Sequence, residues 1–336
     1  MKLSVVVATF NRPVLLERLL LQLGKQTLRA DQFEVVVVDD GSRVPARVGL
    51  ASLELPFRLR VEEQANAGAA AARHRGALVA EGELLLITDD DMQVPEDFLE
   101  QHVRLHAESP APRVVVGRIR PDPSLSAMPL FERWYAHRLE KMAEGFSSGR
   151  VKPRGNFLFT GNVSMRRADY LAVGGFDPAL KRSEDLELGL KLEKLGATTV
   201  FAEHAFTLHG SDHTELATWL QRAYLYGIYD LRIQRKHPDM PHADPWRFMF
   251  RLSPAARPLL ALAAAAPTVT RPLSSLAWRA VEAADRLGLE KLAFAGSSVV
   301  YQMEYFRGVR AEAGSLISTV RDFARYARTR WGAHPG

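Results

Sequence analysis

The chain has 336 residues, of which 47% are hydrophobic and 25% are charged, values that are ordinary for a globular protein and exclude a disordered one. Its formal net charge of +5 is too small to indicate nucleic-acid binding. The absence of cysteine excludes a disulfide framework, a thiolate nucleophile and a zinc–thiolate site. Because no cleavage site follows the first apolar run and the apolar stretch 259–269 is too short to span a bilayer, we expect a cytoplasmic protein.

Strand-like and helix-like segments alternate from the first residue. Runs rich in aliphatic residues, typical of buried parallel strands, cover 3–8, 34–38, 57–61, 84–88 and 113–117. Between them, apolar spacing or alanine-rich composition predicts helices over 13–23, 68–80 and 95–106. Repeated βαβ units of this kind predict an α/β protein with a doubly wound, mostly parallel sheet and helices on both faces.

The pattern changes after about residue 120. Longer helices are predicted over 127–144, 184–195 and 214–236, with a short strand over 198–202 and a connection over 203–208. Beyond Pro238 the sequence is rich in proline and alanine and has no clear strand. We therefore expect one domain over 1–240, with a 1–120 half and a 121–240 half, followed by a helical C-terminal extension over 241–336.

Two clusters of acids follow predicted strands, Asp39-Asp40 and Asp89-Asp90-Asp91. In doubly wound sheets, ligands bind outside the carboxyl ends of the strands. Three adjacent carboxylates repel one another, and such clusters are typical of sites for Mg²⁺ or Mn²⁺. The alternative interpretation is a solvated acidic turn before a helix. Because neither a G-x-G-x-x-G motif after a strand nor a phosphate-binding P-loop is present, the sequence favours a nucleotide held by a metal.

Several motifs, in this order, resemble those of glycosyltransferase family 2, whose members have the GT-A fold. They are Val5-Val6-Val7-Ala8-Thr9-Phe10-Asn11-Arg12, Asp39-Asp40-Gly41-Ser42, Asn66-Ala67-Gly68 with Arg73, Asp89-Asp90-Asp91 with Pro95, Gly161-Asn162, and Ser183-Glu184-Asp185. The resemblance covers about residues 1–235. It implies an inverting transferase that binds a nucleotide sugar through the 1–120 half and an acceptor through the 121–240 half.

The resemblance also implies roles for individual residues. The donor nucleotide sugar would be bound by Thr9, Phe10, Asn11, Arg12, Asp40, Asn66, Gly68, Arg73, Asp89 and Asp90. Asp40 matches the acid that accepts a hydrogen bond from the base. A carboxylate opposite an N3–H group suits uracil or thymine, and a UDP-sugar is the expected donor. The divalent cation, Mn²⁺ or Mg²⁺, would be held by Asp90 and Asp91 with His209 as a further ligand, and His213 is the alternative histidine.

Glu184 and Asp185 open a predicted helix, where acids also complement the helix dipole without any catalytic role. The resemblance implies that Asp185 is the catalytic base, with Glu184 beside it, in a single displacement. Gly161 and Asn162 would shape the acceptor side. The acceptor would be a hydroxyl of a glycan, a lipid-linked glycan or a small molecule, as in polysaccharide biosynthesis.

Two rival functions stay open. One is a nucleotide-sugar pyrophosphorylase-like nucleotidyltransferase, which would normally show a glycine-rich, arginine-containing loop after the first strand, where Thr9-Phe10-Asn11-Arg12-Pro13 stands instead. The other is a non-catalytic glycan-binding subunit with the same fold. Release of nucleoside diphosphate, rather than pyrophosphate or nothing, distinguishes a transferase from both.

The C-terminal segment is basic. Arg321, Arg325 and Arg328 recur at helical spacing beside aromatic residues, which is compatible with a helix lying on anionic lipid at the inner face of the cell membrane. The alternative is a solvated basic face on a terminal helix. For 241–336, a homodimer contact and an acceptor platform are further roles left open, and no nucleic-acid partner is expected.

Overall fold

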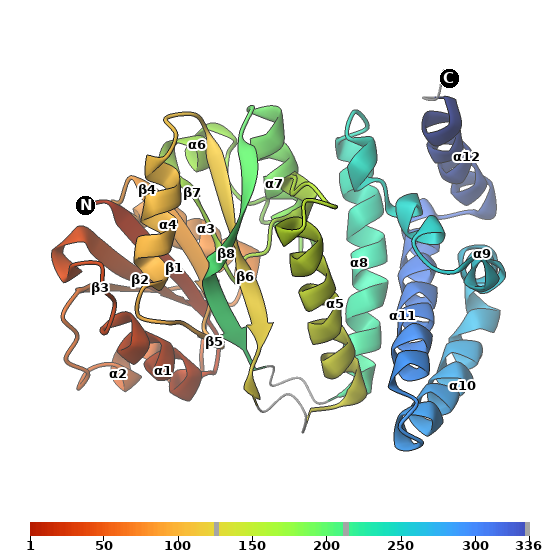
Figure 1. The fold of residues 1–336 in the computed structure, drawn as a ribbon, viewed down its shortest axis with the longest axis horizontal. Coiled ribbons are helices and arrows are strands. Elements are labelled where there is room, and N and C mark those ends of the chain that lie inside the picture. The colour runs from red at the N-terminus through yellow and green to blue at the C-terminus, as the bar shows by residue number, and fades with distance from the viewer. Residues whose placement is uncertain (124–127, 211–214, 333–336) are drawn as a thin grey trace. The chain divides into compact units, whose positions relative to one another are not determined.

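The computed structural model describes residues 1–123, 128–210 and 215–332, apart from the side chains of 330–332. The chain forms two compact units (Figure 1). The first comprises 1–125 and 136–211, and the second comprises 126–135 and 212–336. The second unit therefore begins before the predicted boundary near 240, because helix α8 (Leu216–Lys236) groups with the later helices.

The first unit contains an eight-stranded mixed sheet in the order β3-β2-β1-β4-β7-β6-β8-β5. Its strands are β1 (Leu3–Thr9), β2 (Phe33–Asp39), β3 (Arg58–Glu63), β4 (Leu84–Asp89), β5 (Met92–Gln93), β6 (Arg113–Pro121), β7 (Val163–Arg166) and β8 (Thr198–His209). Strands β1 to β4 pair in parallel, as do β6 and β8, whereas β7 runs antiparallel to both of its neighbours. The predicted α/β fold with a mostly parallel sheet is confirmed.

The sequence pattern missed two strands and shortened others, chiefly β6, predicted over 113–117, and β8, predicted over 198–202. Strand β5 has two residues and β7 has four, lengths at which hydrophobic periodicity carries little signal. The predicted connection over 203–208 is wrong, because β8 continues to His209. A β-bulge at Gly117/Arg118 of the β6–β8 pair interrupts the alternation that would have revealed the longer strand.

Helices cover both faces of the sheet. In the first unit they are α1 (Pro13–Leu23), α2 (Ala46–Gly49), α3 (Ala69–Val79), α4 (Phe98–Ala107), α6 (Arg167–Ala172) and α7 (Glu184–Lys194), while α5 (Leu130–Ser147) begins in the second unit and ends in the first. Alternate residues of β1 face opposite ways, so Val5 and Val7 pack in the core with α1 and α4, and Val6 packs with α3 and α7. Gly76 allows α3 to approach β1, because a Cβ there would lie 2.5 Å from Cγ1 of Val6.

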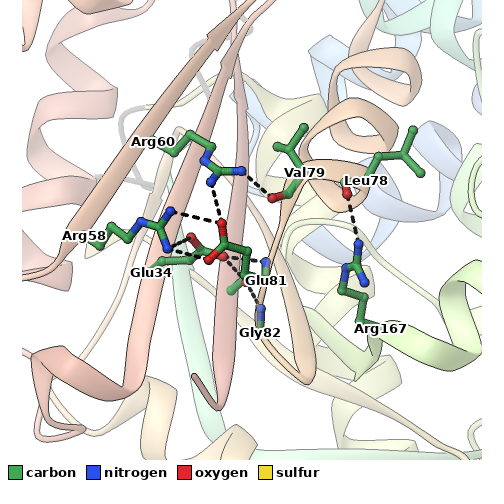
Figure 2. Close-up of polar contacts among 9 residues, drawn as sticks. Glu34, Arg58, Arg60, Leu78, Val79, Glu81, Gly82 and Arg167 are labelled. Carbon is green, nitrogen blue, oxygen red and sulfur yellow. Dashed lines mark hydrogen bonds and ion pairs between the residues drawn. The ribbon is translucent and has the colours of Figure 1, made fainter.

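A polar cluster closes the amino ends of the first strands (Figure 2). Glu34, at the start of β2, is fully buried and accepts hydrogen bonds from Oγ of Ser4 and from the backbone N–H of Glu81, both at 2.7 Å. Around it, Arg58 and Arg60 form ion pairs with Glu81. These bonds join β1, β2 and β3 to the turn that leads into β4, at the end of the sheet opposite to the acidic clusters.

The second unit is helical in the part that the structure describes. Its helices are α8, α9 (Arg257–Ala265), α10 (Pro267–Arg286), α11 (Glu290–Ala313) and α12 (Leu316–Gly332), with short 3-10 turns at Pro241–Ala243, Pro245–Phe250 and Pro254–Ala256. Glycines at the crossing of α8 and α11 let the backbones touch, since a Cβ on Gly227 or Gly308 would lie 1.9 Å from a carbonyl oxygen of the other helix. Figure 1 shows α9, α10 and α12 on the opposite side of α11 from α8. None of the described helices combines the length and the apolar character that a bilayer crossing requires.

Candidate active site

The predicted acidic clusters meet at one edge of the sheet. Strand β1 lies between β2 and β4, and the strand order reverses between β1 and β4, so the carboxyl ends of all three strands lie side by side. In register, Thr9 at the end of β1 is opposite Asp39 of β2, and Ala8 is opposite Asp89 of β4. This is the position at which doubly wound sheets bind ligands.

Asp90 and Asp91 share one cationic partner. Nη1 of Arg12 lies 3.1 Å from Oδ1 of Asp90 and 3.2 Å from Oδ2 of Asp91, and the hydroxyl of Thr9 donates to Asp90 at 2.7 Å. Both carboxylates are buried. Burial raises the pKa of Asp90 to about 6, against the lowering effect of Thr9 and Arg12. For Asp91, burial is outweighed by His209 and Arg12, which lower its pKa below the ordinary value.

His209 reaches this cluster through the sheet. Because the β5–β8 ladder places His209 opposite Met92, the residue after Asp91, its Nε2 lies 3.7 Å from Oδ2 of Asp91. His213 lies outside the described residues. Among the described residues, no group of three or more acid or histidine side chains is arranged to hold a metal ion as it stands. However, Oδ1 of Asp91 is buried without a hydrogen-bond partner, so the donor set of hard oxygens with one imidazole fits Mn²⁺ or Mg²⁺.

Asp40 holds a neighbouring loop. Its carboxylate accepts hydrogen bonds from the backbone N–H groups of Ala67 and Gly68, at 2.9 and 2.8 Å, and from Nε2 of Gln64 at 2.7 Å. Asn66 completes the loop by donating to the backbone carbonyl of Asp40 at 3.0 Å. A carboxylate has about four acceptor positions, so Asp40 retains about one for a ligand. Its expected contact with a base stays a prediction.

The residues between β1 and α1 form a second loop at the same edge. Asn11 adopts a left-handed backbone with φ of 56°, which asparagine tolerates better than most residues. Its backbone N–H donates to Oγ of Ser42, and its side-chain oxygen accepts from the backbone N–H of Arg43. The neighbouring Phe10 ring is 45% exposed, which is unusual for phenylalanine and leaves a planar surface for a ligand.

Arg73 connects the β4 edge to a distant part of the chain. From the buried face of α3, its Nη2 lies 2.5 Å from Asp89 and its Nη1 lies 2.8 Å from Glu184. Burial opposes the charge on Arg73, but Asp89, Glu184 and Asp185 raise its pKa above the ordinary value, so it stays cationic. The N-terminus of α7, with its two acids, therefore lies beside the carboxyl end of β4.

Glu184 and Asp185 differ in their surroundings. Glu184 is held by Arg73, whereas Oδ1 of Asp185 accepts the backbone N–H of Leu186 at 2.8 Å. Both side chains are half-buried at the first turn of α7, where the helix dipole also favours carboxylates. The structure thus brings both predicted catalytic acids to the edge that carries Asp89 to Asp91.

Gly161 and Asn162 occupy an interior position. The carbonyl of Gly161 accepts from the hydroxyl of Thr88 at 3.0 Å. Asn162 is fully buried. Its side-chain oxygen accepts a hydrogen bond from Nε2 of His102 at 2.9 Å, and its side-chain nitrogen donates to the carbonyl of Ala205 at 2.9 Å within the β-bulge. The Asn162 side chain, which also donates to the carbonyl of Arg118 at 3.3 Å, is therefore committed to joining α4, β6 and β8. Contact of these residues with an acceptor stays a prediction, for which the structure offers no exposed Asn162 atom.

Three residues of the site were not anticipated from the sequence. Gln64 braces Asp40, Arg18 donates to the backbone carbonyl of Asp91 at 3.1 Å, and His102 fixes Asn162. Each lies far in sequence from its partner and belongs to no motif. Only Arg18 could have been suggested by its place in the sequence. It lies on α1, whose N-cap is Arg12, six residues after that residue.

Comparison with known proteins identifies the family. A model described as glycosyl transferase family 2 matches residues 4–173, about half of the chain. Validoxylamine A glucosyltransferase from Streptomyces hygroscopicus subsp. jinggangensis is 31% identical over 268 residues, which cover 71% of this chain and 61% of that protein. An uncharacterized glycosyltransferase from Haemophilus influenzae is 27% identical over 203 residues, 56% of this chain and 61% of its own length. The matches thus span less than two thirds of these relatives.

Solved structures share the architecture. The mannosyltransferase PcManGT from Pyrobaculum calidifontis, solved with GDP-Man and Mn²⁺, superposes with a TM-score of 0.63 at 20% identity over 99% of this chain and 88% of that one. TarS residues 1–349 from S. aureus, solved with UDP-GlcNAc, gives a TM-score of 0.53 at 16% identity over 100% and 93%. The expected GT-A fold is confirmed, and the chain belongs to glycosyltransferase family 2.

Proposed function

We propose that the protein is an inverting, metal-dependent glycosyltransferase that moves one sugar from a nucleoside-diphosphate sugar to an acceptor hydroxyl. The single observation that carries the proposal is the Arg73 bridge. By bonding to Asp89 and to Glu184, Arg73 places the candidate base beside the strand end that carries the acidic cluster. A donor held at one end of this bridge can therefore be attacked by a hydroxyl activated at the other.

The donor is proposed to be a UDP-sugar. The acceptor position left on Asp40 suits the N3–H of uracil, and the exposed ring of Phe10 can stack on the base. The TarS structure with UDP-GlcNAc supports a uridine donor, whereas the mannosyltransferase structure with GDP-Man shows that the fold also accepts guanosine. The base is therefore part of the proposal and is decided by experiment.

In the proposed reaction, Asp185 accepts the proton of the acceptor hydroxyl as its oxygen attacks the anomeric carbon. The bond between that carbon and the phosphate oxygen breaks, and the nucleoside diphosphate leaves with the electron pair. One displacement inverts the anomeric configuration and needs no covalent enzyme intermediate. Glu184 is already paired with Arg73, so Asp185 is the acid proposed as base. A divalent cation held by Asp90, Asp91 and His209 would neutralise charge on the leaving diphosphate as a Lewis acid.

Two measurements test this function. A thermal-shift panel of nucleotide sugars, with and without Mn²⁺, identifies the donor, because a ligand that binds the native state raises the unfolding temperature. Turnover with that donor should then release nucleoside diphosphate and a glycoside. Asp185→Asn should lower turnover by at least about a hundredfold while donor binding is retained. Near-native turnover of Asp185→Asn would remove its role as base, and release of pyrophosphate would instead support a nucleotidyltransferase.

A further inference from the structure

Helices α10, α11 and α12 of the second unit present an uncommon combination of exposed leucines and arginines. Across α10, α11 and α12, six exposed side chains are cationic: Arg271, Arg279, Arg286, Lys291, Arg321 and Arg328. In the same helices, and among the described residues, Glu290 is the only exposed acid. This excess is local, because the whole chain carries a net charge of only +5.

The imbalance arises because the other acids of these helices have partners inside the unit. Asp285 pairs with Arg133 at 2.6 Å, and Glu312 pairs with Arg232 at 2.8 Å. Asp322 pairs with Arg235 at 2.9 Å. Glu304 accepts from the hydroxyl of Ser274, and Glu282 accepts from the indole N–H of Trp278. The outward-facing cations are therefore left without intramolecular neutralisation.

Exposed aliphatic side chains lie among these cations. Along α10 and the residue that follows its end, Val269, Leu276 and Leu287 are separated by seven and eleven residues, so they form one line along the helix axis. The line continues into the turn before α11 and its first residues, at Leu289 and Leu292. These five side chains are 50% to 74% exposed. Together with Arg271, Arg279, Arg286 and Lys291, they are called the α10 surface below.

The cations of the α10 surface are available to a ligand. Arg279 and Arg286 are seven residues apart and so lie on one side of the helix, beside the aliphatic line. Arg271, Arg279, Arg286 and Lys291 form no ion pair with any described residue. An aliphatic line flanked by unpaired cations has the composition of helices that lie in the plane of a bilayer, with apolar residues inserted and cations at the headgroups.

We propose that the α10 surface docks the protein on a membrane that contains anionic lipid. Nucleic acid fits less well, because no aromatic side chain of α10 to α12 is exposed in the described part of these helices and bases bind by stacking on such rings. A second copy of the same surface fits less well too, since cations of like sign would face one another. The proposal does not depend on which sugar or acceptor the enzyme uses.

Vesicle sedimentation with the full chain tests the proposal. Phosphatidylcholine vesicles containing phosphatidylserine should bind the protein, vesicles of phosphatidylcholine alone should not, and added salt should weaken binding. Two double variants probe the two components of the surface, Leu276→Ser with Leu287→Ser and Arg279→Glu with Arg286→Glu. Each should weaken binding by at least about tenfold.

Controls show whether a loss of vesicle binding comes from the α10 surface, from unfolding, or from the change in net charge alone. The double variant Val48→Ser with Arg104→Glu makes the same kinds of change at exposed positions of the first unit and should bind as the parent does. All variants should keep the parent's unfolding temperature. Vesicle binding is measured without turnover, so failure of the proposed function leaves it unaffected. Equal binding of the parent and both double variants would overturn the proposal. The proposal would also be overturned if the parent formed dimers that the double variant Leu276→Ser with Leu287→Ser does not form. An affinity of the parent for duplex DNA equal to its affinity for the vesicles would overturn it too.

Discussion

The guanidinium of Arg12 holds Asp90 at 3.1 Å and, through the same Nη1 nitrogen, reaches Asp91 at 3.2 Å. A single cation thus offsets the repulsion between two buried carboxylates that are adjacent in sequence. These are the carboxylates that we propose as ligands of the divalent cation. Arg12 and a metal ion would therefore compete for the same oxygens, and Arg12 must release at least one of them when a metal binds.

Replacing Arg12 should consequently strengthen metal binding in the absence of donor. We expect Arg12→Gln to bind Mn²⁺ several-fold more tightly, as measured by isothermal titration. In the parent, the metal must displace an ion pair whose arginine is partly exposed, and such a pair contributes about 1 kcal/mol or less. Arg18→Gln is the matched control, since Arg18 donates to the backbone carbonyl of Asp91 and not to a carboxylate. Weaker binding by Arg12→Gln would show that Arg12 assists the metal instead of competing with it.

The Arg73 bridge should contribute measurably to stability. Arg73→Met leaves Asp89 and Glu184 without their shared cation, and we expect the free energy of unfolding in urea to fall by about 1–3 kcal/mol. Arg73→Lys should recover only part of this loss, because one ammonium group cannot match the fork of a guanidinium. Arg75→Met on the same helix, whose partner Glu62 is at the surface, should change stability by about 0.5 kcal/mol or less. Equal effects at Arg73 and Arg75 would contradict a special role for the bridge.

The sequence predicted the location of the site better than its internal contacts. Acid clusters after aliphatic runs locate a ligand edge because parallel strands align their carboxyl ends, and this placed Asp40 and Asp89 correctly at that edge. The carboxylate of Asp40 accepts hydrogen bonds from Gln64, Ala67 and Gly68, which fill most of its acceptor positions. These bonds depend on how one loop closes. Local periodicity carries no information about such a closure.

The same limit explains why β8 was predicted too short and why the α10 surface was not anticipated. The extension of β8 to His209 depends on a bulge that Asn162, the residue before β7, fills with its side chain. The arginine-rich C-terminal segment was evident from sequence, whereas the α10 surface was not. Its charge depends on which acids the fold turns inward, as with Asp285 toward Arg133. Contacts between residues distant in sequence decide both features.

Two buried histidines should make the protein sensitive to acid. Burial lowers the pKa of His102 to about 3 and that of His106 to about 4. In the unfolded chain each has a pKa of about 6.5. Between these values the unfolded state binds more protons, so stability should fall as the pH falls below about 6.5. The contribution of these groups to stability is fully present above that pH.

A variant that lacks His102 separates the contribution of this histidine from that of the carboxylates that titrate in the same pH range. His102→Gln should be less stable than the parent at pH 7.5, because bonds to Ser164 and Asn162 are weakened. The deficit should shrink by up to about 2 kcal/mol at pH 5, since only the parent loses stability through His102. Urea denaturation at both pH values measures it, and His137→Gln, at an exposed position, is the control. A deficit that grows on acidification would show that His102 is protonated in the native state.

The Glu34 cluster should stabilise the fold without affecting the chemistry. Glu34→Ala removes the acceptor shared by the hydroxyl of Ser4 and the backbone N–H of Glu81, and leaving such buried donors unsatisfied costs about 1–3 kcal/mol. Glu34→Gln keeps one carbonyl oxygen at that position and should lose less. Because the cluster lies at the amino ends of the strands, Glu34→Ala should retain the parent's turnover per folded molecule at low temperature.

Glu63 offers the comparison that separates burial from charge in this effect. It lies on the adjacent strand β3, is exposed, and pairs with Arg47 at 3.3 Å, so Glu63→Ala removes the same chemical group from a solvated site. We expect its free energy of unfolding to stay within about 0.5 kcal/mol of the parent. If both alanine variants were equally stable, the loss at Glu34 would not come from unsatisfied buried donors. If fully folded Glu34→Ala had a lower turnover than the parent, the two ends of the sheet would be coupled.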